Sequence, residues 1–392
     1  MASNERQNAR REREEKKNKR NRTVIWIILI IIVAALAIMK VLEIDFDELK
    51  NRFTDSNGNF TISATTDVDS YPYTLDSSKV LDMSLNNDKL NILTDSSLTV
   101  INPTDAEKIY GFDHGYAEPI ISRAGNYFCM IDQGGTRIRL DTNNDTKYES
   151  KLDNIVLTAA VAKNGNVVYA TQNSDAKSQL VVVSASLERM LTYSENGGYV
   201  TDVAIDASGK KIAYVTVNSK NAELVSTVVT FTIGDKGPDT EFEYIGTNIL
   251  DLHYSSSKLY VVGDNCLSVI SGQSKRKDVY KQSGICVNKF CYTRNNELVL
   301  DYSKYQGASA NTIVYVNSSG KVKTEIPLKK QVVNLSVSSN KIVALFDNSA
   351  EVYSLTKGEK KRTFRVDEGT KQAVLIGNNL YVHHGQVVDV KE

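Results

Sequence analysis

The chain has 392 residues, of which 41% are hydrophobic, and its 47 basic and 47 acidic side chains cancel to a formal net charge of zero. This composition excludes collagen-like chains, fully disordered chains and membrane proteins with many spans. The length is enough to bury a large core. Nothing in the overall charge indicates a nucleic-acid partner, and we expect none.

The charges are unevenly distributed along the chain. Residues 1–22 carry nine Lys and Arg against four Glu, a net charge of +5. From Glu43 onward there are 37 basic and 43 acidic side chains, a net charge of −6. The two parts are therefore expected to lie in different surroundings, with the basic tail in the cytoplasm.

An apolar segment separates these two parts. Val24 to Met39 is an unbroken apolar run, and it reaches Leu42 if the ammonium group of Lys40 extends to the interface. Such a helix is about 28 Å long, close to the thickness of a bilayer core of roughly 30 Å. We therefore predict a single transmembrane helix over residues 23–42, with Trp26 near the cytoplasmic interface and the remainder of the chain extracytoplasmic.

Two alternatives to an uncleaved anchor remain. Ala35-Leu36-Ala37 is typical of a signal-peptide cleavage site, although the apolar run continues through Met39 and the basic leader is long for a signal peptide. The second alternative is a buried core helix. The basic leader is interpreted as a positive-inside determinant, with binding of anionic lipid or nucleic acid as its alternative.

The next residues predict a spacer between the span and a folded body. Apolar residues recur with helical spacing at Leu42, Phe46, Leu49 and Phe53, which indicates a helical stem over residues 43–53. Residues 54–70 are rich in Ser, Thr, Asn and Asp without an apolar period, and are interpreted as a linker.

The remaining residues repeat one pattern. Short Val, Ile, Leu and Tyr runs alternate with small polar turns, and no helical period is sustained. Turn clusters recur about every 38 to 48 residues, each followed by a strand pattern. The eight clusters are Asn86-Asn87-Asp88, Ala124-Gly125, Asn164-Gly165, Ser208-Gly209, Ser255-Ser256-Ser257, Asn295-Asn296, Ser338-Ser339-Asn340 and Gly377-Asn378.

Four antiparallel strands per repeat, joined by tight turns, are typical of a β-propeller blade. Residues 71–392 are therefore predicted to form an all-β propeller of eight four-stranded blades, with seven blades as the alternative. The last repeat begins near Lys371 and has room for three strands only. We expect residues 70–75 to supply its missing outer strand and close the ring.

One repeat carries a recognisable motif. Residues 204–216, Ala-Ile-Asp-Ala-Ser-Gly-Lys-Lys-Ile-Ala-Tyr-Val-Thr, resemble the repeat of TolB-type propellers, and weaker forms surround Asn164-Gly165 and Asn295-Asn296. The repeats are WD40-like in length but lack the Trp-Asp signature. Anchor, linker and degenerate propeller together resemble membrane-anchored propellers of a Gram-positive bacterial family of unknown function. That resemblance implies an extracytoplasmic location and supplies no catalytic residues.

The four cysteines show no metal or redox spacing and are interpreted as structural thiols. Cys286 and Cys291 lie five residues apart in one predicted strand, which separates them by about 16 Å and is expected to point them to opposite faces. Asp141, Asn143 and Asp145 imitate the start of a calcium loop that the following residues do not complete.

No motif of an enzyme or cofactor site is present, so no catalytic, metal-binding or cofactor-binding residue is assigned. Three long loops between second and third strands, over residues 172–178, 218–223 and 303–311, and a solvated turn at residues 383–385 in the last repeat are the candidate binding loops. Drift of tolerated loops is the alternative explanation. The candidate residues are Lys304, Tyr305, Gln306, Ser174, Asp175, Lys220, Asn221, His383 and His384.

The leading hypothesis is a non-enzymatic binding or scaffolding module, anchored in the cell membrane through residues 23–42. Its expected partner is a protein or a cell-envelope polymer, and no small-molecule cofactor is expected. One alternative is a glycan-active envelope enzyme with carboxylates at the centre of the ring, and a second is a transmembrane sensor. A pair of central carboxylates with raised pKa values would favour the enzyme.

Overall fold

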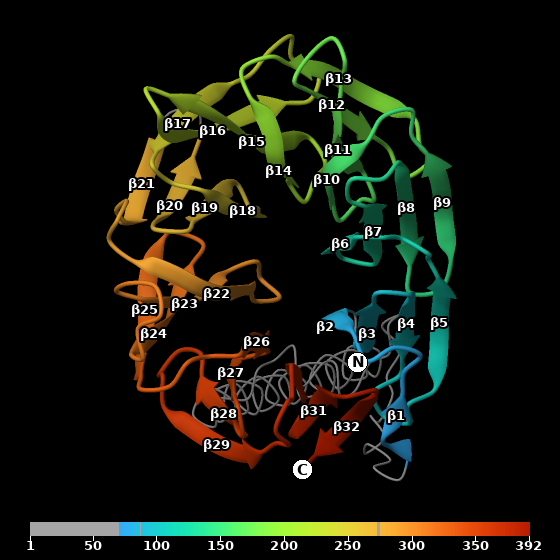
Figure 1. Cartoon of the computed structure of the whole chain (residues 1–392), viewed down its shortest axis with the longest axis vertical. Coiled ribbons are helices and arrows are strands. Elements are labelled where there is room, and N and C mark those ends of the chain that lie inside the picture. The colour runs from blue at the N-terminus through green and yellow to red at the C-terminus, as the bar shows by residue number, and fades with distance from the viewer. Residues whose placement is uncertain (1–69, 87, 273–274) are drawn as a thin grey trace, which may run out of the picture. The chain divides into compact units, whose positions relative to one another are not determined.

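The computed structural model describes residues 70–392 apart from residues 87, 273 and 274. This part of the chain forms eight antiparallel sheets of four strands each, arranged in a ring around a central axis (Figure 1). The prediction of an all-β propeller with eight blades is confirmed, and the seven-bladed alternative is wrong.

The predicted basic tail, transmembrane helix and helical stem, and all of the linker except residue 70, lie outside the described residues. Within the described residues, no helix has the length and the apolar character that crossing a bilayer requires.

In blades 1 to 4 the strands pair in chain order, with the first strand next to the axis and the fourth at the rim (Figure 1). Blade 1 comprises β2 (Val80–Asn86), β3 (Lys89–Thr94), β4 (Ser97–Ile101) and β5 (Lys108–Asp113). Blade 2 comprises β6 (Pro119–Ala124), β7 (Tyr127–Asp132), β8 (Arg137–Thr142) and β9 (Thr146–Lys151). Blade 3 comprises β10 (Val156–Val161), β11 (Val167–Gln172), β12 (Ser178–Val183) and β13 (Arg189–Glu195). Blade 4 comprises β14 (Tyr199–Ile205), β15 (Lys211–Lys220), β16 (Glu223–Thr232) and β17 (Thr240–Ile245).

Blades 5 to 7 repeat this order, and blade 8 takes its outer strand from the start of the propeller. Blade 5 comprises β18 (Ile249–Ser255), β19 (Lys258–Gly263), β20 (Leu267–Ser271) and β21 (Lys275–Tyr280). Blade 6 comprises β22 (Cys286–Tyr292), β23 (Leu298–Ser303), β24 (Asn311–Asn317) and β25 (Lys321–Leu328). Blade 7 comprises β26 (Asn334–Ser338), β27 (Lys341–Phe346), β28 (Ser349–Ser354) and β29 (Lys360–Arg365). Blade 8 comprises β30 (Gln372–Ile376), β31 (Asn379–His384), β32 (Val387–Lys391) and β1 (Tyr73–Thr74).

The ring is closed as the sequence predicts. Strand β1 pairs antiparallel with β32, with Tyr73 opposite Val388 and Thr74 opposite Val387. The backbone N–H of Leu75 donates to the carbonyl oxygen of Gln386 at 2.8 Å and continues the ladder. Blade 8 therefore contains both ends of the propeller sequence.

The eight predicted turns all lie between the first and second strands of a blade, and each contains a residue with positive φ. These residues are Asp88, Gly125, Gly165, Gly209, Ser256, Asn296, Ser339 and Gly377. Six of the eight are Gly, Asn or Asp, which adopt this backbone conformation at low cost, and the other two are Ser. At Gly165 (φ 84°) an added Cβ would also lie 2.8 Å from the Cβ of Ala185.

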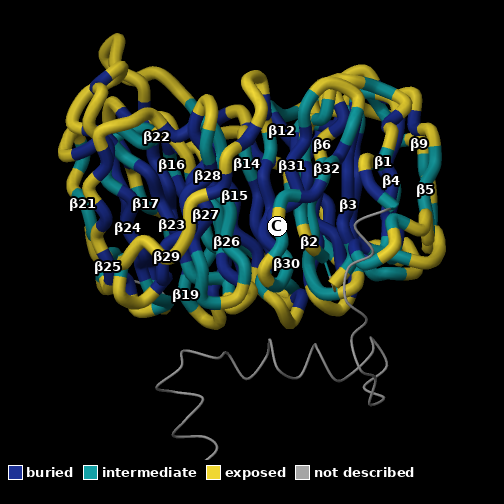
Figure 2. The backbone as a smooth tube through the Cα atoms, turned by 90° about the horizontal axis from the view of Figure 1, so that it is seen from below, coloured by how far each residue is buried: buried dark blue, intermediate teal, exposed yellow. Residues whose placement is uncertain are grey.

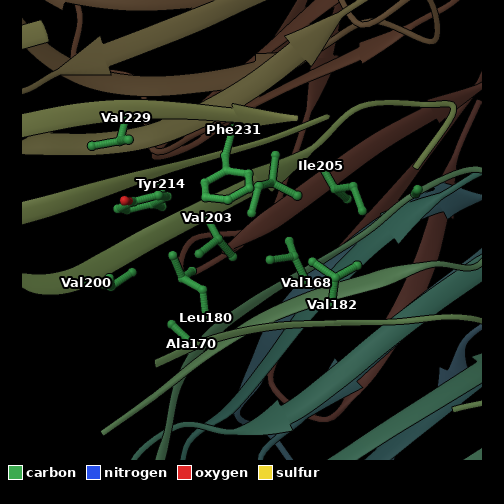
Figure 3. Packing of buried hydrophobic residues seen from close by; sticks show 12 residues of the cluster. Val168, Ala170, Leu180, Val182, Val200, Val203, Ile205, Tyr214, Val229 and Phe231 are labelled. Atoms are coloured by element: carbon green, nitrogen blue, oxygen red, sulfur yellow. The ribbon is translucent and has the colours of Figure 1, made fainter. Parts of the chain in front are cut away.

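The core is divided among the interfaces between blades. Each of the eight interfaces buries its own apolar cluster. The second and third strands are covered by a neighbouring blade on both faces, so they are almost continuously buried, whereas loops at both ends of the ring are exposed (Figure 2). Between blades 3 and 4, Leu180 and Val182 pack against Val203, Tyr214 and Phe231 (Figure 3).

Innermost strands of five blades contain a register shift near their first residues, at Val80/Asp82, Val156/Thr158, Val200/Asp202, Ile249/Asp251 and Val287/Lys289. In β22 this bulge corrects one prediction. Cys286 pairs with Ser303 and Cys291 pairs with Val299. The cysteines are five residues apart but their partners are only four residues apart, because the bulge adds one residue to β22. Both thiols therefore lie on the same face of the sheet. All four cysteines are nevertheless free.

Candidate binding face

The loops that join second and third strands lie at the same end of the ring as the loops between blades. Backbone hydrogen bonds connect the two sets: Asp264 N–H donates to Asn248 O at 2.9 Å, and Val366 N–H donates to Asn348 O at 3.2 Å. We call this end the loop face. Its loops are 95–96, 133–136, 173–177, 221–222, 264–266, 304–310, 347–348 and 385–386 within blades, and 75–79, 114–118, 152–155, 196–198, 246–248, 281–285, 329–333 and 366–371 between blades.

Lys304, Tyr305 and Gln306 lie in the loop between β23 and β24, and all three are exposed. The Tyr305 side chain is 68% exposed. Its backbone is held in place, because its carbonyl oxygen accepts hydrogen bonds from Ser303 Oγ at 2.9 Å and from the N–H of Ala308 at 3.2 Å. The loop therefore presents an aromatic ring to solvent from an anchored base.

Ser174 and Asp175 lie in the loop between β11 and β12, where the N–H of Asp175 donates to Asn173 Oδ1 at 2.8 Å. Lys177 in the same loop donates to the carbonyl oxygen of Gly197, at 3.2 Å. This second candidate loop is thus connected to the loop between blades 3 and 4.

Lys220 and Asn221 occupy a tight hairpin, although the sequence predicts a long loop over 218–223. Strands β15 and β16 continue to Lys220 and from Glu223, so that Asn221 and Ala222 alone form the turn, with φ values of 53° and 64°. Two consecutive positive φ values are typical of a type I′ turn, whose twist matches that of the flanking strands. The feature is an extended two-stranded arm on the loop face.

His383 and His384 are the last residues of β31, not members of a solvated turn. His383 is 2% exposed, and its Nε2 lies 3.0 Å from Gly385 O. Burial lowers the pKa of His383, so the neutral ring is favoured. His383 therefore does not present its ring to a partner.

His384 belongs to a charged cluster at the same edge of blade 8. Its Nε2 lies 3.7 Å from Asp367 Oδ2, and Asp389 lies close enough for the three side chains to share a metal ion. However, Lys391 Nζ lies 3.2 Å from Asp367 Oδ2 and 2.8 Å from Asp389 Oδ2. The ammonium group already contacts both carboxylates, so the geometry is that of an ion-pair network.

Among the described residues, the three most exposed large apolar or aromatic side chains lie on the loop face. Tyr305, Tyr199 and Ile245 are 68%, 58% and 53% exposed, and all three lie at this end of their strands or in its loops. Five further exposed apolar side chains share this end: Leu81, Ile120, Ile155, Leu224 and Leu250. Four lie at the opposite end: Leu85, Ile109, Leu187 and Met190. Exposed apolar side chains on one face are typical of an interaction surface.

Sequence reasoning did not identify a polar group beside the axis of the ring. Asp202 of β14 and Asp251 of β18 occupy equivalent positions, each directly after a bulge in an innermost strand. Asp202 Oδ2 accepts a hydrogen bond from the N–H of Leu252 at 2.8 Å, and Tyr292 Oη donates to Asp251 Oδ2. These contacts connect three consecutive blades.

The environment of this pair disfavours charge. Burial, followed by repulsion from Asp251, raises the pKa of Asp202 well above its usual range. Burial raises the pKa of Asp251 to about 6, although the Tyr292 hydrogen bond opposes the shift. The His253 ring stacks on Tyr292 with centroids 3.7 Å apart, and burial lowers the pKa of His253 to about 4. The shared Val/Ile-x-Asp pattern of Val200-Thr201-Asp202 and Ile249-Leu250-Asp251 would have aligned the two aspartates.

A pocket of about 560 Å³ opens at the seam between blades 6 and 7, within the range of small-ligand sites. Sequence reasoning missed it because its walls come from two blades and the loop between them. Its lining residues are Lys289, Lys330, Gln331, Val332, Val333, Phe346, Asp347 and Asn348. The Lys330 ammonium lies 4.8 Å from the centroid of the Phe346 ring and 3.1 Å from Glu351 Oε1.

Solved structures share this fold at low sequence identity. The C-terminal WD40 domain of Sif2 is 13% identical with a TM-score of 0.55, over 82% of this chain and 98% of that chain. Sqt1 from Chaetomium thermophilum, bound to the N-terminus of the ribosomal protein L10, is 10% identical with a TM-score of 0.54, over 82% of this chain and 98% of that chain. Sqt1 from Saccharomyces cerevisiae is 8% identical with a TM-score of 0.54, over 82% of this chain and 97% of that chain.

No protein with a curated description matches the sequence. The model of one protein family, described as "Family of unknown function (DUF5711)", matches residues 59–390. This match spans the propeller except for its last two residues, together with the residues directly before it, so the chain belongs to that family of unknown function.

Proposed function

We propose that the protein is a non-enzymatic binding module, anchored in the cell membrane by residues 23–42, whose extracytoplasmic propeller binds a partner protein through the loop face. The observation that carries this proposal is the position of Tyr305, Tyr199 and Ile245 on that face, because they are the three most exposed large apolar or aromatic side chains of residues 70–392 as described. Aromatic side chains are enriched where proteins bind one another.

The fold also supports a binding role. A closed ring of sheets holds its loops in fixed positions, so little conformational entropy is lost when a partner binds. The likeness to Sif2 and Sqt1 concerns the fold alone. It indicates that a ring of this kind can bind a protein segment, since the Sqt1 structure is bound to the N-terminus of L10.

Site-specific photocrosslinking in native membranes tests this proposal. A photoreactive amino acid in place of Tyr305 should yield a specific crosslinked protein. The same amino acid in place of Leu187, which is exposed at the opposite end, should not. Adding Y199S and I245S should reduce the Tyr305 crosslink several-fold. Equal crosslinking from both ends, or a yield that these substitutions leave unchanged, would contradict the proposal.

A second candidate function is supported by the raised pKa values of Asp202 and Asp251. A carboxyl group whose pKa is raised can act as a general acid toward a glycan, with its neighbour as base or nucleophile. This candidate predicts turnover of a cell-envelope glycan by the purified chain and its loss in both D202N and D251N. Glycan turnover that persists in both variants would exclude these two carboxyl groups as the catalytic pair.

A sensor remains the third hypothesis, and it depends on the cytoplasmic tail. Replacing residues 1–22 by an unrelated basic leader should abolish a signalling response but leave partner binding intact. An unchanged cellular response would rule out a sensing role for the tail sequence.

A further inference from the structure

Polar side chains of blade 6 meet at the loop-face end of its sheet. Asn311 Nδ2 lies 3.4 Å from Asp301 Oδ2, and Ser303 Oγ lies 3.4 Å from Asn288 Oδ1 and 2.9 Å from the carbonyl oxygen of Tyr305. We call these five residues the oxygen cluster. It combines a carboxylate, two side-chain amides, a hydroxyl and a backbone carbonyl.

Two oxygens of this cluster are buried without a donor. Asp301 is 0% exposed and Asn311 is 5% exposed, and the Oδ1 atom of each accepts no hydrogen bond from any described residue. Burial raises the pKa of Asp301 to about 6, although a hydrogen bond from Asn288 and the charge of Lys289 oppose the shift. The surrounding protein therefore compensates the carboxylate only in part.

The register of the strands places Asp301 toward the seam pocket. Asp301 pairs with Lys289 on one side and Ile313 on the other, so the three side chains share one face of the sheet. Ile313 packs in the core cluster that contains Val332 and Phe346, and both of these line the pocket, as does Lys289. Asn288 and Lys289 are exposed, so the oxygen cluster borders solvent on this side.

We propose that the oxygen cluster is a calcium-binding site. Calcium takes six to eight oxygen ligands from carboxylates, amide and backbone carbonyls and water, with a flexible geometry. The cluster offers carboxylate, amide and hydroxyl oxygens, and the two oxygens that accept no hydrogen bond from any described residue would be ligands of the cation. The Tyr305 carbonyl, which already accepts two hydrogen bonds, holds Ser303 in position. Because the donor set has one carboxylate, the site belongs to the weak class, with a dissociation constant on the order of 10⁻⁴–10⁻³ M.

Binding has a consequence for the neighbouring loop. Ser303 and the Tyr305 carbonyl form the base of loop 304–310, so a bound ion stiffens the segment that carries the most exposed aromatic ring. The Lys289 ammonium, which faces the same side as Asp301, repels the ion and weakens binding. The site is independent of whether the loop face binds a protein.

Isothermal titration of the full-length, chelator-treated chain with calcium chloride tests the proposal. We expect one saturable site of millimolar or submillimolar affinity, weakened at least tenfold by D301N and tightened several-fold by K289M. The matched control is D347N, which removes an exposed carboxylate at the same seam and should leave affinity unchanged. Near-ultraviolet circular dichroism should show native tertiary structure in all variants.

Absence of a saturable site in the wild-type chain would overturn the proposal, and so would equal affinity in wild type and D301N. Equal affinity for magnesium, which demands stricter octahedral geometry, would also contradict a calcium site. If D301N fails to fold, the calcium affinity of K289M tests the proposal. A cation close to Asp301 should bind more tightly once the positive charge of Lys289 is removed, and unchanged affinity would contradict the proposal.

Discussion

Carboxyl groups beside the axis bind protons more tightly in the folded chain than in the unfolded chain. For Asp251 the cause is burial, which raises the pKa from an ordinary value near 3.8 to about 6. Between these two values the native state holds a proton that the unfolded state has released. The contribution of this group to the free energy of unfolding therefore decreases as the pH rises through that window.

D251N should remove this pH dependence. The amide keeps an oxygen that accepts from Tyr292 and carries no charge. We expect the variant to match the wild type near pH 4 and to be more stable at pH 7 by roughly 1–3 kcal/mol. Urea unfolding at the two pH values measures the difference, with D175N as the exposed control. A difference that is the same at both values would contradict the burial argument.

Apolar residues between blades supply most of the stability of the ring. Phe231 is 1% exposed and packs against blade 3 (Figure 3). F231A should lower the free energy of unfolding by about 3–5 kcal/mol, because it removes buried area and leaves a cavity. The control is M190A, whose side chain is 43% exposed and whose loss should cost less than about 0.5 kcal/mol. Equal effects in denaturant unfolding would contradict the assigned interface.

At the scale of elements, the turns between first and second strands are the best-predicted feature of the chain. Small polar residues mark all eight, because each turn needs a residue that tolerates positive φ. The bulges were not predicted, because the position of an extra residue depends on how a strand pairs with its neighbour, which the sequence of one strand does not show. Their omission produced the wrong orientation for Cys286 and Cys291. The arm at Asn221 was missed because its polar strand residues resemble a loop.

Substitution of Gly165 tests the account of the turns. In G165A the new Cβ would lie 2.8 Å from Ala185 Cβ and 2.9 Å from Tyr127 Cζ, at a φ of 84°. We expect a loss of about 1–3 kcal/mol in the free energy of unfolding. G237A is the matched control, because nothing lies within 4 Å of its Cβ position and its φ is not positive, and it should be neutral or slightly stabilising. Equal losses in the two variants would be inconsistent with the turn geometry.

At the scale of the whole molecule, the sequence predicted the number of blades and the closure of the ring, because both follow from counting repeats. It did not predict which side chains converge. Asp202, Asp251 and Tyr292 come from three blades, and the seam pocket comes from two. Such convergence depends on the register of each blade relative to its neighbours, which periodicity within one repeat does not determine.

Disulfide crosslinking across the closure tests the central claim most directly. In a chain without its native cysteines, T74C and V387C should form a disulfide under mild oxidation, because these residues are direct partners in β1 and β32. L187C paired with V387C places the second thiol on blade 3 and should remain reduced. A gel-mobility shift for the first pair alone is the predicted result. Failure of Thr74 and Val387 to crosslink in folded protein, or equal crosslinking of both pairs, would contradict a ring closed by its first strand.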